Sequence, residues 1–160
     1  MKNIAITCLV LVAVCVGLQA KKTVKAPYFM AASSNQLEIE KVTLGKDTTW
    51  VDAKIYTISG DDVRIDSTTV LQVAGKRYAY LGGDGFSKGL WTRVPASGEL
   101  SVTLKFEPLP MDAESFDFME MPDNDDKGWC IYGVRLDGKK PAIGVPEKLL
   151  DQQLDYSLPL

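Results

Sequence analysis

The chain has 160 residues, with 18 Lys and Arg against 21 Asp and Glu, a formal net charge of −3, and no His. The absence of His excludes Ser-His-Asp and Cys-His catalysis, His-ligated zinc and haem, and His-based proton transfer. Because nucleic-acid phosphates require a basic face, a mildly acidic chain is not expected to bind nucleic acid.

Residues 1–20 are typical of a secretory signal peptide. Lys2 is followed by an apolar run over residues 4–18, and Ala20 is a small residue before the expected cleavage point. The apolar run is shorter than the roughly 18–20 residues that span a bilayer. We therefore expect a mature chain without a membrane span, periplasmic or extracellular. An uncleaved anchor and a lipoprotein attached at Cys15 are the less favoured alternatives.

The rest of the chain is expected to form one domain. Residues 21–35 are interpreted as a lead-in segment, residues 36–140 as the domain, and residues 141–160 as a tail with a short helix at Pro146–Leu154. The 46% hydrophobic content is sufficient for a core.

Short runs of alternating apolar and polar residues, separated by turn residues, predict an all-β domain. In the first run the apolar parity changes, which predicts a bulge or bend near Glu40 and Lys41. The number and spacing of the runs favour an immunoglobulin-like antiparallel β-sandwich of seven or eight strands, with a short C-terminal helical turn. The expected strands lie within residues 37–44, 50–56, 63–65, 69–73, 76–81, 100–106, 116–118 and 129–136.

Two connecting segments resemble ligand loops only in part. Residues 123–128 place carboxylates at alternate positions before a glycine, but Lys127 stands where a calcium ligand is needed and Val134 where the loop requires Glu. The glycine-rich residues 82–90 miss both the dinucleotide and the P-loop spacing. We interpret them as an inter-strand turn and a surface loop, and predict no metal and no cofactor.

Cys130 is the only cysteine after the signal segment, so no internal disulfide is expected. Its parity with Tyr132, Val134 and Leu136 predicts that all four side chains face the core, where a thiol is inert. A disulfide between two chains is the alternative if the thiol is exposed. No catalytic residue is predicted.

Four aromatic residues are candidate ligand-binding residues. Trp50 and Trp129 have the parity opposite to the core-facing residues, Tyr56 shares a strand face with Trp50, and Trp91 follows the glycine-rich segment. Outward aromatic side chains can stack on sugars or anchor a protein partner. We expect Trp50, Tyr56 and Trp129 to form one surface, unless these rings cover a second face or cap the ends of the core.

Several segments together resemble the N-terminal β-rich domain of secreted bacterial thioredoxin-family proteins of the disulfide-reductase type. They are SNQLEIEKVTL (34–44), DAKIY (52–56), PASGE (95–99), SFDFME (115–120) and IYGVRL (131–136). The resemblance implies a secreted β-rich fold and an accessory role in envelope thiol-redox or stress physiology. It implies no redox centre here, since the chain contains no Cys-x-x-Cys.

The sequence therefore predicts a secreted, non-catalytic protein that binds an envelope protein or a glycan. The accessory redox role is one alternative. A carboxylate-only hydrolase is another, and it requires two of four carboxylates to meet across a cleft. These are Asp112, Glu114, Asp117 and Glu120.

Overall fold

The computed structural model describes residues 21–84, 86, 88–121, 123 and 128–141. This part of the chain is all-β, as expected, and has no helix long and apolar enough to cross a membrane. The signal segment and the helix expected at Pro146–Leu154 lie outside the described residues. The strands are β1 (Lys22–Lys25), β2 (Ala31–Ala32), β3 (Leu37–Leu44), β4 (Thr49–Tyr56), β5 (Asp62–Val63), β6 (Val70–Val73), β7 (Lys76–Asp84), β8 (Thr92–Arg93), β9 (Glu99–Phe106), β10 (Ser115–Met119) and β11 (Cys130–Arg135).

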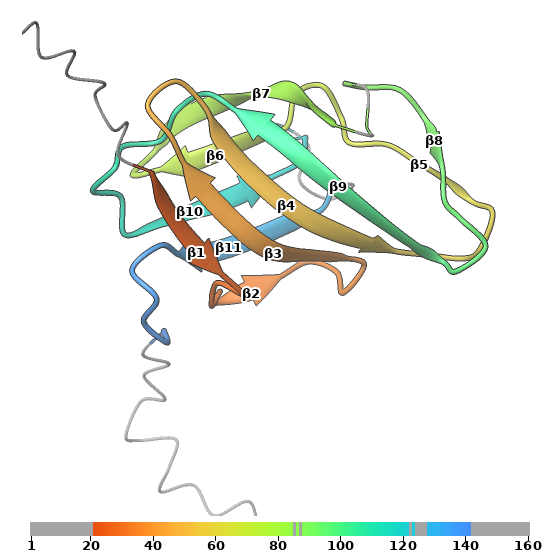
Figure 1. Ribbon diagram of the computed structural model, residues 1–160, viewed down its shortest axis with the longest axis horizontal. Helices are drawn as coiled ribbons and strands as arrows, with labels where there is room; N and C mark the ends of the chain where they lie inside the picture. Colours follow the sequence, from red (N-terminus) through yellow and green to blue (C-terminus); the bar gives the residue numbers. More distant parts are fainter. Residues whose placement is uncertain (1–20, 85, 87, 122, 124–127, 142–160) are drawn as a thin grey trace, which may run out of the picture.

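Nine strands form a single antiparallel sheet in the order β1-β3-β4-β9-β7-β6-β10-β11-β2, and β5 pairs separately with β8. The sheet curls on itself, so that β3, β4 and β9 lie in front of β6, β10 and β11 (Figure 1). The described strands outnumber the seven or eight expected, because very short strands carry too few residues to show alternation. Nine of them form one continuous sheet, whereas an immunoglobulin sandwich has two.

β7 joins the two halves of the curled sheet. Its first residues pair with β6, from Lys76 opposite Val73 onward, and its last residues pair with β9, from Tyr80 opposite Phe106 onward. The register shifts between Tyr80 and Gly82, where Gly82 has φ +124°. Such a bulge bends and twists a strand, and only glycine adopts that φ without strain.

Part of the glycine-rich segment is therefore strand and not loop, which corrects the prediction. Gly82, Gly83 and Asp84 pair with β9. A Cβ on Gly83 would lie 2.6 Å from the Thr103 carbonyl oxygen, so the close approach of the two backbones requires glycine there. The glycines serve the bend in β7.

The bulge predicted in β3 is confirmed. The register with β4 shifts between Ile39 and Lys41. The shift returns the apolar side chains to the core, so that residues on both sides of the bulge are buried, including Ile39 and Val42. A change of apolar parity within one strand was thus a reliable signal.

A third bulge overturns the parity predicted for β11. The β10–β11 register shifts between Phe116 and Phe118, and Gly133 donates its N–H to Asp117 Oδ1 at 2.7 Å. As a result Ile131 is buried and Tyr132 is exposed, the reverse of the prediction. Cys130 faces the core as expected and is 1% exposed.

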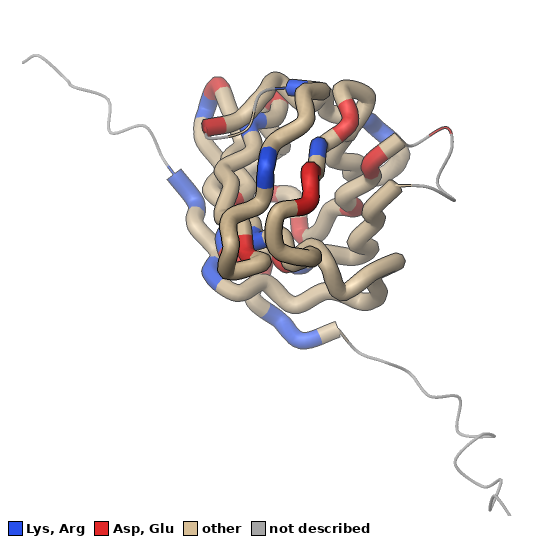
Figure 2. The backbone as a smooth tube through the Cα atoms, turned by 90° about the vertical axis from the view of Figure 1, so that its right-hand side faces the viewer, with Lys and Arg blue, Asp and Glu red and all other residues tan. Residues whose placement is uncertain are grey.

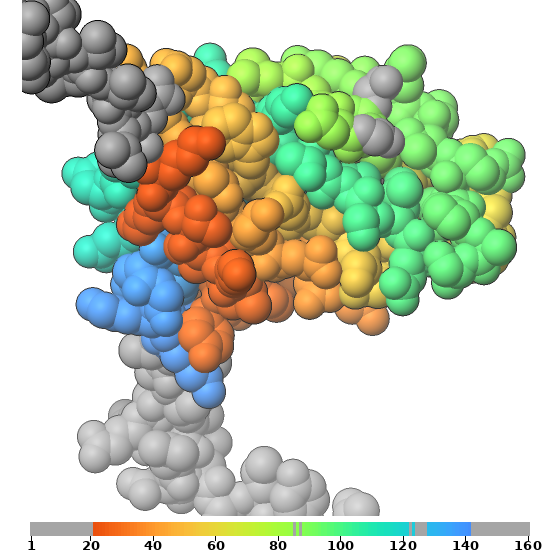
Figure 3. All heavy atoms as spheres, in the orientation of Figure 1, coloured from red at the N-terminus to blue at the C-terminus, as the bar shows by residue number. Residues whose placement is uncertain are grey.

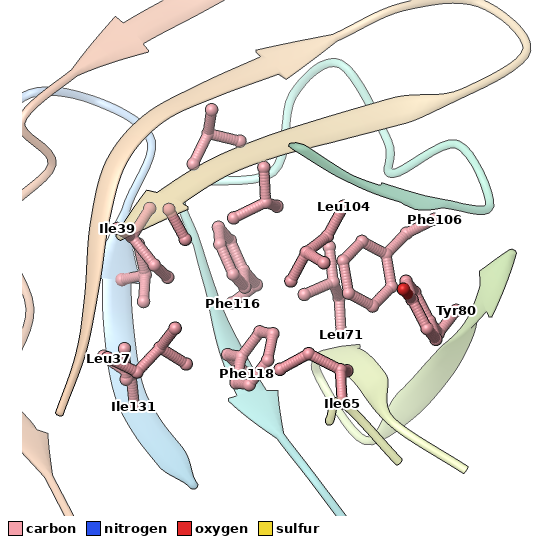
Figure 4. Close-up of a cluster of buried hydrophobic side chains, with 14 of the residues drawn as sticks. Leu37, Ile39, Ile65, Leu71, Tyr80, Leu104, Phe106, Phe116, Phe118 and Ile131 are labelled. Carbon is pink, nitrogen blue, oxygen red and sulfur yellow. The ribbon is translucent and has the colours of Figure 1, made fainter. Parts of the chain in front are cut away.

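The core lies between the two halves of the curled sheet. Phe116 and Phe118 of β10 point toward side chains of the opposite half of the sheet (Figure 4). There the Phe106 ring stands edge-on to the Phe118 ring, with 6.1 Å between the ring centres. The Tyr80 ring lies 5.4 Å from Phe106, at the bend of β7. Edge-on and tilted pairs of this kind stabilise a core beyond the area they bury.

A substitution at Tyr80 tests this description of the core. The Tyr80 hydroxyl is buried with no hydrogen-bond partner among the described residues, and burial raises its pKa to about 12. Replacing Tyr80 with Phe removes this unpartnered group, so we expect the free energy of unfolding to rise by about 1 kcal/mol in urea titrations. Tyr56→Phe is the control, because its hydroxyl donates to Glu38 at 2.8 Å and its loss is expected to lower stability slightly. A larger loss for Tyr80→Phe than for Tyr56→Phe would contradict this description of the core.

Candidate functional site

Two of the predicted binding residues, Trp50 and Tyr56, lie on the outer face of β4. They are six residues apart, which is roughly 20 Å of extended strand. The Trp50 ring packs so closely on Gly45 that a Cβ there would lie 2.6 Å from it. Tyr56 is bonded to Glu38. Both rings therefore have structural contacts at opposite ends of the strand.

The outer face around them is a network of ion pairs and hydrogen bonds. Lys54 of β4 contacts Glu40 at 3.2 Å, and Thr103 of β9 donates to Asp52 at 2.7 Å. Side chains of β3, β4 and β9 form a continuous surface there (Figure 3). Exposed pairs of this kind contribute at most about 1 kcal/mol each to stability. A shallow pocket of about 290 Å³ lies on this face and contains no aromatic residue.

Trp91 and Trp129, in contrast, line one cleft. It has a volume of about 300 Å³ and lies where the β5–β8 pair meets the end of β10 and the start of β11. Acidic and basic residues lie side by side at this end of the molecule (Figure 2). The structure thus brings Trp129 together with Trp91, and not with Trp50 or Tyr56. The cleft is lined by Asp62, Val63, Arg64, Asp66, Trp91, Glu120, Met121 and Trp129.

Trp91 is 65% exposed, yet its surroundings orient it. The Arg64 guanidinium lies 5.1 Å from the centre of the indole ring, and its Nη2 lies 3.5 Å from Asp66 Oδ2. A guanidinium over an indole face is a favourable cation–π contact. The ring is therefore presented to solvent in a defined position.

The short β5–β8 pair carries this half of the cleft. Asp62 lies opposite Arg93 and Val63 opposite Thr92. The buried Val63 side chain belongs to the core cluster and fixes the pair to the rest of the domain. Trp91 thus stands on a backbone that the core holds in place.

Glu120 forms the floor of the cleft and ties its two sides together. Its Oε1 accepts the Asp66 N–H at 2.8 Å, and its Oε2 accepts the Trp129 N–H at 3.0 Å. The side chain is only 8% exposed. Burial raises the pKa of Glu120, and the two backbone N–H groups oppose that rise.

Gly128 allows Glu120 and Trp129 to approach each other. A Cβ on Gly128 would lie 2.2 Å from the Glu120 carbonyl oxygen, so no larger residue fits without moving the backbone. The Glu120 N–H in turn donates to the Trp129 carbonyl at 3.0 Å. The backbones at the end of β10 and the start of β11 are therefore locked together.

The pKa of Asp66 is shifted in the opposite direction to that of Glu120. Asp66 Oδ1 accepts both the Thr68 N–H at 2.8 Å and the Thr68 hydroxyl at 2.7 Å. These two bonds, with a smaller contribution from Arg64, hold the pKa of Asp66 below its usual value. The cleft thus contains two carboxyl groups whose pKa values are shifted in opposite directions.

Sequence reasoning did not select Arg64 or Asp66, and it considered Glu120 only as a catalytic candidate. A signal for Glu120 was present, because it has the same strand parity as the buried Phe116 and Phe118. An acidic residue at a core-facing position has to find hydrogen-bond donors. Its donors belong to two distant segments, which no local pattern reveals.

Most of the acidic segment considered as a calcium loop lies outside the described residues. Within the described part of the chain, no three Asp, Glu or Cys side chains are grouped as metal ligands.

Comparison of the chain with protein-family models, curated proteins and solved structures found no match.

The bridging role of Glu120 can be tested by removing its charge. In Glu120→Gln one carboxylate oxygen becomes an NH₂ group that faces a backbone N–H, leaving a buried donor unpaired. We expect the free energy of unfolding to fall by about 1–3 kcal/mol in chemical denaturation. The control is Glu114→Gln, whose side chain is 79% exposed and for which no measurable change is expected. Equal effects of the two substitutions would contradict a bridging role for Glu120.

Proposed function

We propose that this chain is a secreted, non-catalytic binding module that holds a glycan in the cleft between Trp91 and Trp129. In this proposal the two facing halves of the curled sheet serve as a rigid scaffold, in the manner of the two sheets of an immunoglobulin-like sandwich. The observation that carries the proposal is the 65% exposure of Trp91, on an oriented side chain, in a cleft with a second Trp and several polar groups. Sugars are bound by such combinations, because a pyranose ring has an apolar C–H face and a polar rim.

The two indole rings have different roles in this proposal. Trp129 packs against the core and forms a fixed wall, whereas Trp91 leaves most of its ring in water. Each Å² of apolar surface withdrawn from water contributes about 25 cal/mol, so a ligand that covers Trp91 gains from a surface that is already ordered. A preorganised ring also loses little side-chain entropy on binding.

Hydrolysis is the second candidate, and one observation favours it. Asp66 and Glu120 share the cleft with pKa values shifted apart, which is how carboxyl pairs divide acid and base roles. Against it, both oxygens of Glu120 accept backbone N–H groups and Asp66 Oδ1 is held by Thr68. Neither carboxyl group is thus arranged to protonate a leaving group. Of the four carboxylates considered from the sequence, Glu120 alone lines this cleft.

The two alternatives that require a protein partner have less support. The thiol of Cys130 is buried in the domain, so it is not placed for exchange with a redox partner or for a disulfide between chains. An accessory redox role therefore depends on the family resemblance alone. A protein ligand would cover the same exposed indole, but the 300 Å³ cleft matches one or two sugar residues better than a flat interface.

The glycan proposal is tested by the pair Trp91→Ala and Leu90→Ala on an array of neutral, basic and acidic oligosaccharides. Leu90 is 61% exposed next to Trp91 but does not line the cleft, so it controls for general loss of apolar surface. We expect Trp91→Ala to weaken binding by roughly tenfold or more, as for loss of one stacked aromatic. Thermal melts of both variants are expected to match the parent, since exposed side chains contribute little to stability.

Two results would contradict the proposal. One is that the parent protein retains no oligosaccharide on the array. The other is that Trp91→Ala and Leu90→Ala bind equally well. Release of reducing ends from a bound oligosaccharide, abolished in Glu120→Gln at a temperature where that variant is folded, would favour the hydrolase.

A further inference from the structure

We infer that the cleft selects glycans that carry amino groups and rejects those that carry carboxylate or sulfate groups. This inference rests on the proposed glycan-binding function and names the class of ligand. It is carried by the charges that line the cleft and by the contacts those charges already make.

The lining is rich in carboxyl groups. Asp62, Asp66 and Glu120 all line the cleft, and among the lining residues that the structure describes Arg64 is the single cation. Charges within a few ångströms in a partly dehydrated cleft interact more strongly than in bulk water. An anionic sugar would therefore meet like charge on entering.

The Arg64 guanidinium is already engaged. It lies over the Trp91 ring at 5.1 Å and beside Asp66 at 3.5 Å. A carboxylate or sulfate on a ligand would have to share this guanidinium with Asp66, which lies beside it with the same sign of charge. Specificity against such ligands follows because three carboxyl groups face this one cation, and Asp66 already offsets part of its charge.

Asp62 is the carboxylate that is placed to bind an amino group of the ligand. Its side chain is 46% exposed, more than that of Asp66, and it lies on β5 at the cleft. Arg93 contacts Asp62 Oδ1 through Nε at 3.0 Å, on a guanidinium that is itself 69% exposed. Because this ion pair is solvated and weak, an incoming ammonium can bond the carboxylate at little cost.

The test compares three soluble hexamers with similar ring size: glucosamine, N-acetylglucosamine and galacturonate. Calorimetry is done at mildly acidic pH, where the glucosamine amines are protonated, at low and at high salt. We expect the glucosamine hexamer to bind about three- to tenfold tighter than its N-acetylated counterpart, since one or two exposed ion pairs are gained. Added salt is expected to remove that difference, and the galacturonate hexamer is expected not to bind.

A matched pair of substitutions assigns the preference to Asp62. Asp62→Asn and Asp61→Asn make the same charge change one residue apart, and Asp61 does not line the cleft. Asp62→Asn is expected to abolish the preference for the amine and to admit the galacturonate hexamer weakly, because Arg93 loses its carboxylate partner. Asp61→Asn is expected to bind as the parent does.

The outcomes separate the two proposals. If the N-acetylated hexamer binds as tightly as the glucosamine hexamer at low salt, or the galacturonate hexamer binds as tightly as either, the charge selection is wrong while glycan binding stands. If none of the three hexamers binds, and the array retains nothing, glycan binding itself is wrong. If Asp61→Asn loses the preference as fully as Asp62→Asn does, the assignment to Asp62 is overturned.

Discussion

The bend in β7 is the constraint on which the rest of the domain depends. One strand pairs with β6 through its first half and with β9 through its second, so a single bulge before Gly82 turns a nine-stranded sheet back over itself. The aromatic side chains of Phe106 and Phe118 meet only because of that turn. A curled sheet with its apolar face inward in both halves buries its core without a disulfide, which the described part of the chain does not contain.

The cleft lies where the separate β5–β8 pair packs against one end of the curled sheet. The β5–β8 pair lies outside the main sheet, and the domain connects to it through the buried Val63 and through Glu120. Glu120 uses one carboxylate to satisfy backbone donors from two segments, at Asp66 and at Trp129. A buried charge is costly unless it is hydrogen-bonded, and here the bonds that satisfy it also join the Asp66 segment to Trp129.

Much of the fold was readable from local pattern, and the site was not. Alternation gave the longer strands, and a parity change located the bulge in β3. The parity of β11 was misread because of its bulge, where the Gly133 N–H donates to Asp117, and no alternation signals such a bulge. The pairing of Trp91 with Trp129 was equally hidden, because it depends on how a two-stranded appendage packs against the end of β10. Exposed aromatics were thus found individually from the sequence, while their grouping required tertiary structure.

The measurement that tests the central claim most directly is a ¹H–¹⁵N correlation spectrum of the three indole N–H groups during titration with the glucosamine hexamer. The Trp91 and Trp129 signals report on the cleft, and Trp50 reports on the outer face of β4. A single glycan site in the cleft predicts that the Trp91 and Trp129 signals move together, with one dissociation constant, while the Trp50 signal stays in place. Movement of the Trp50 signal with the same dissociation constant, or no movement of the Trp91 and Trp129 signals at saturating hexamer, would contradict it.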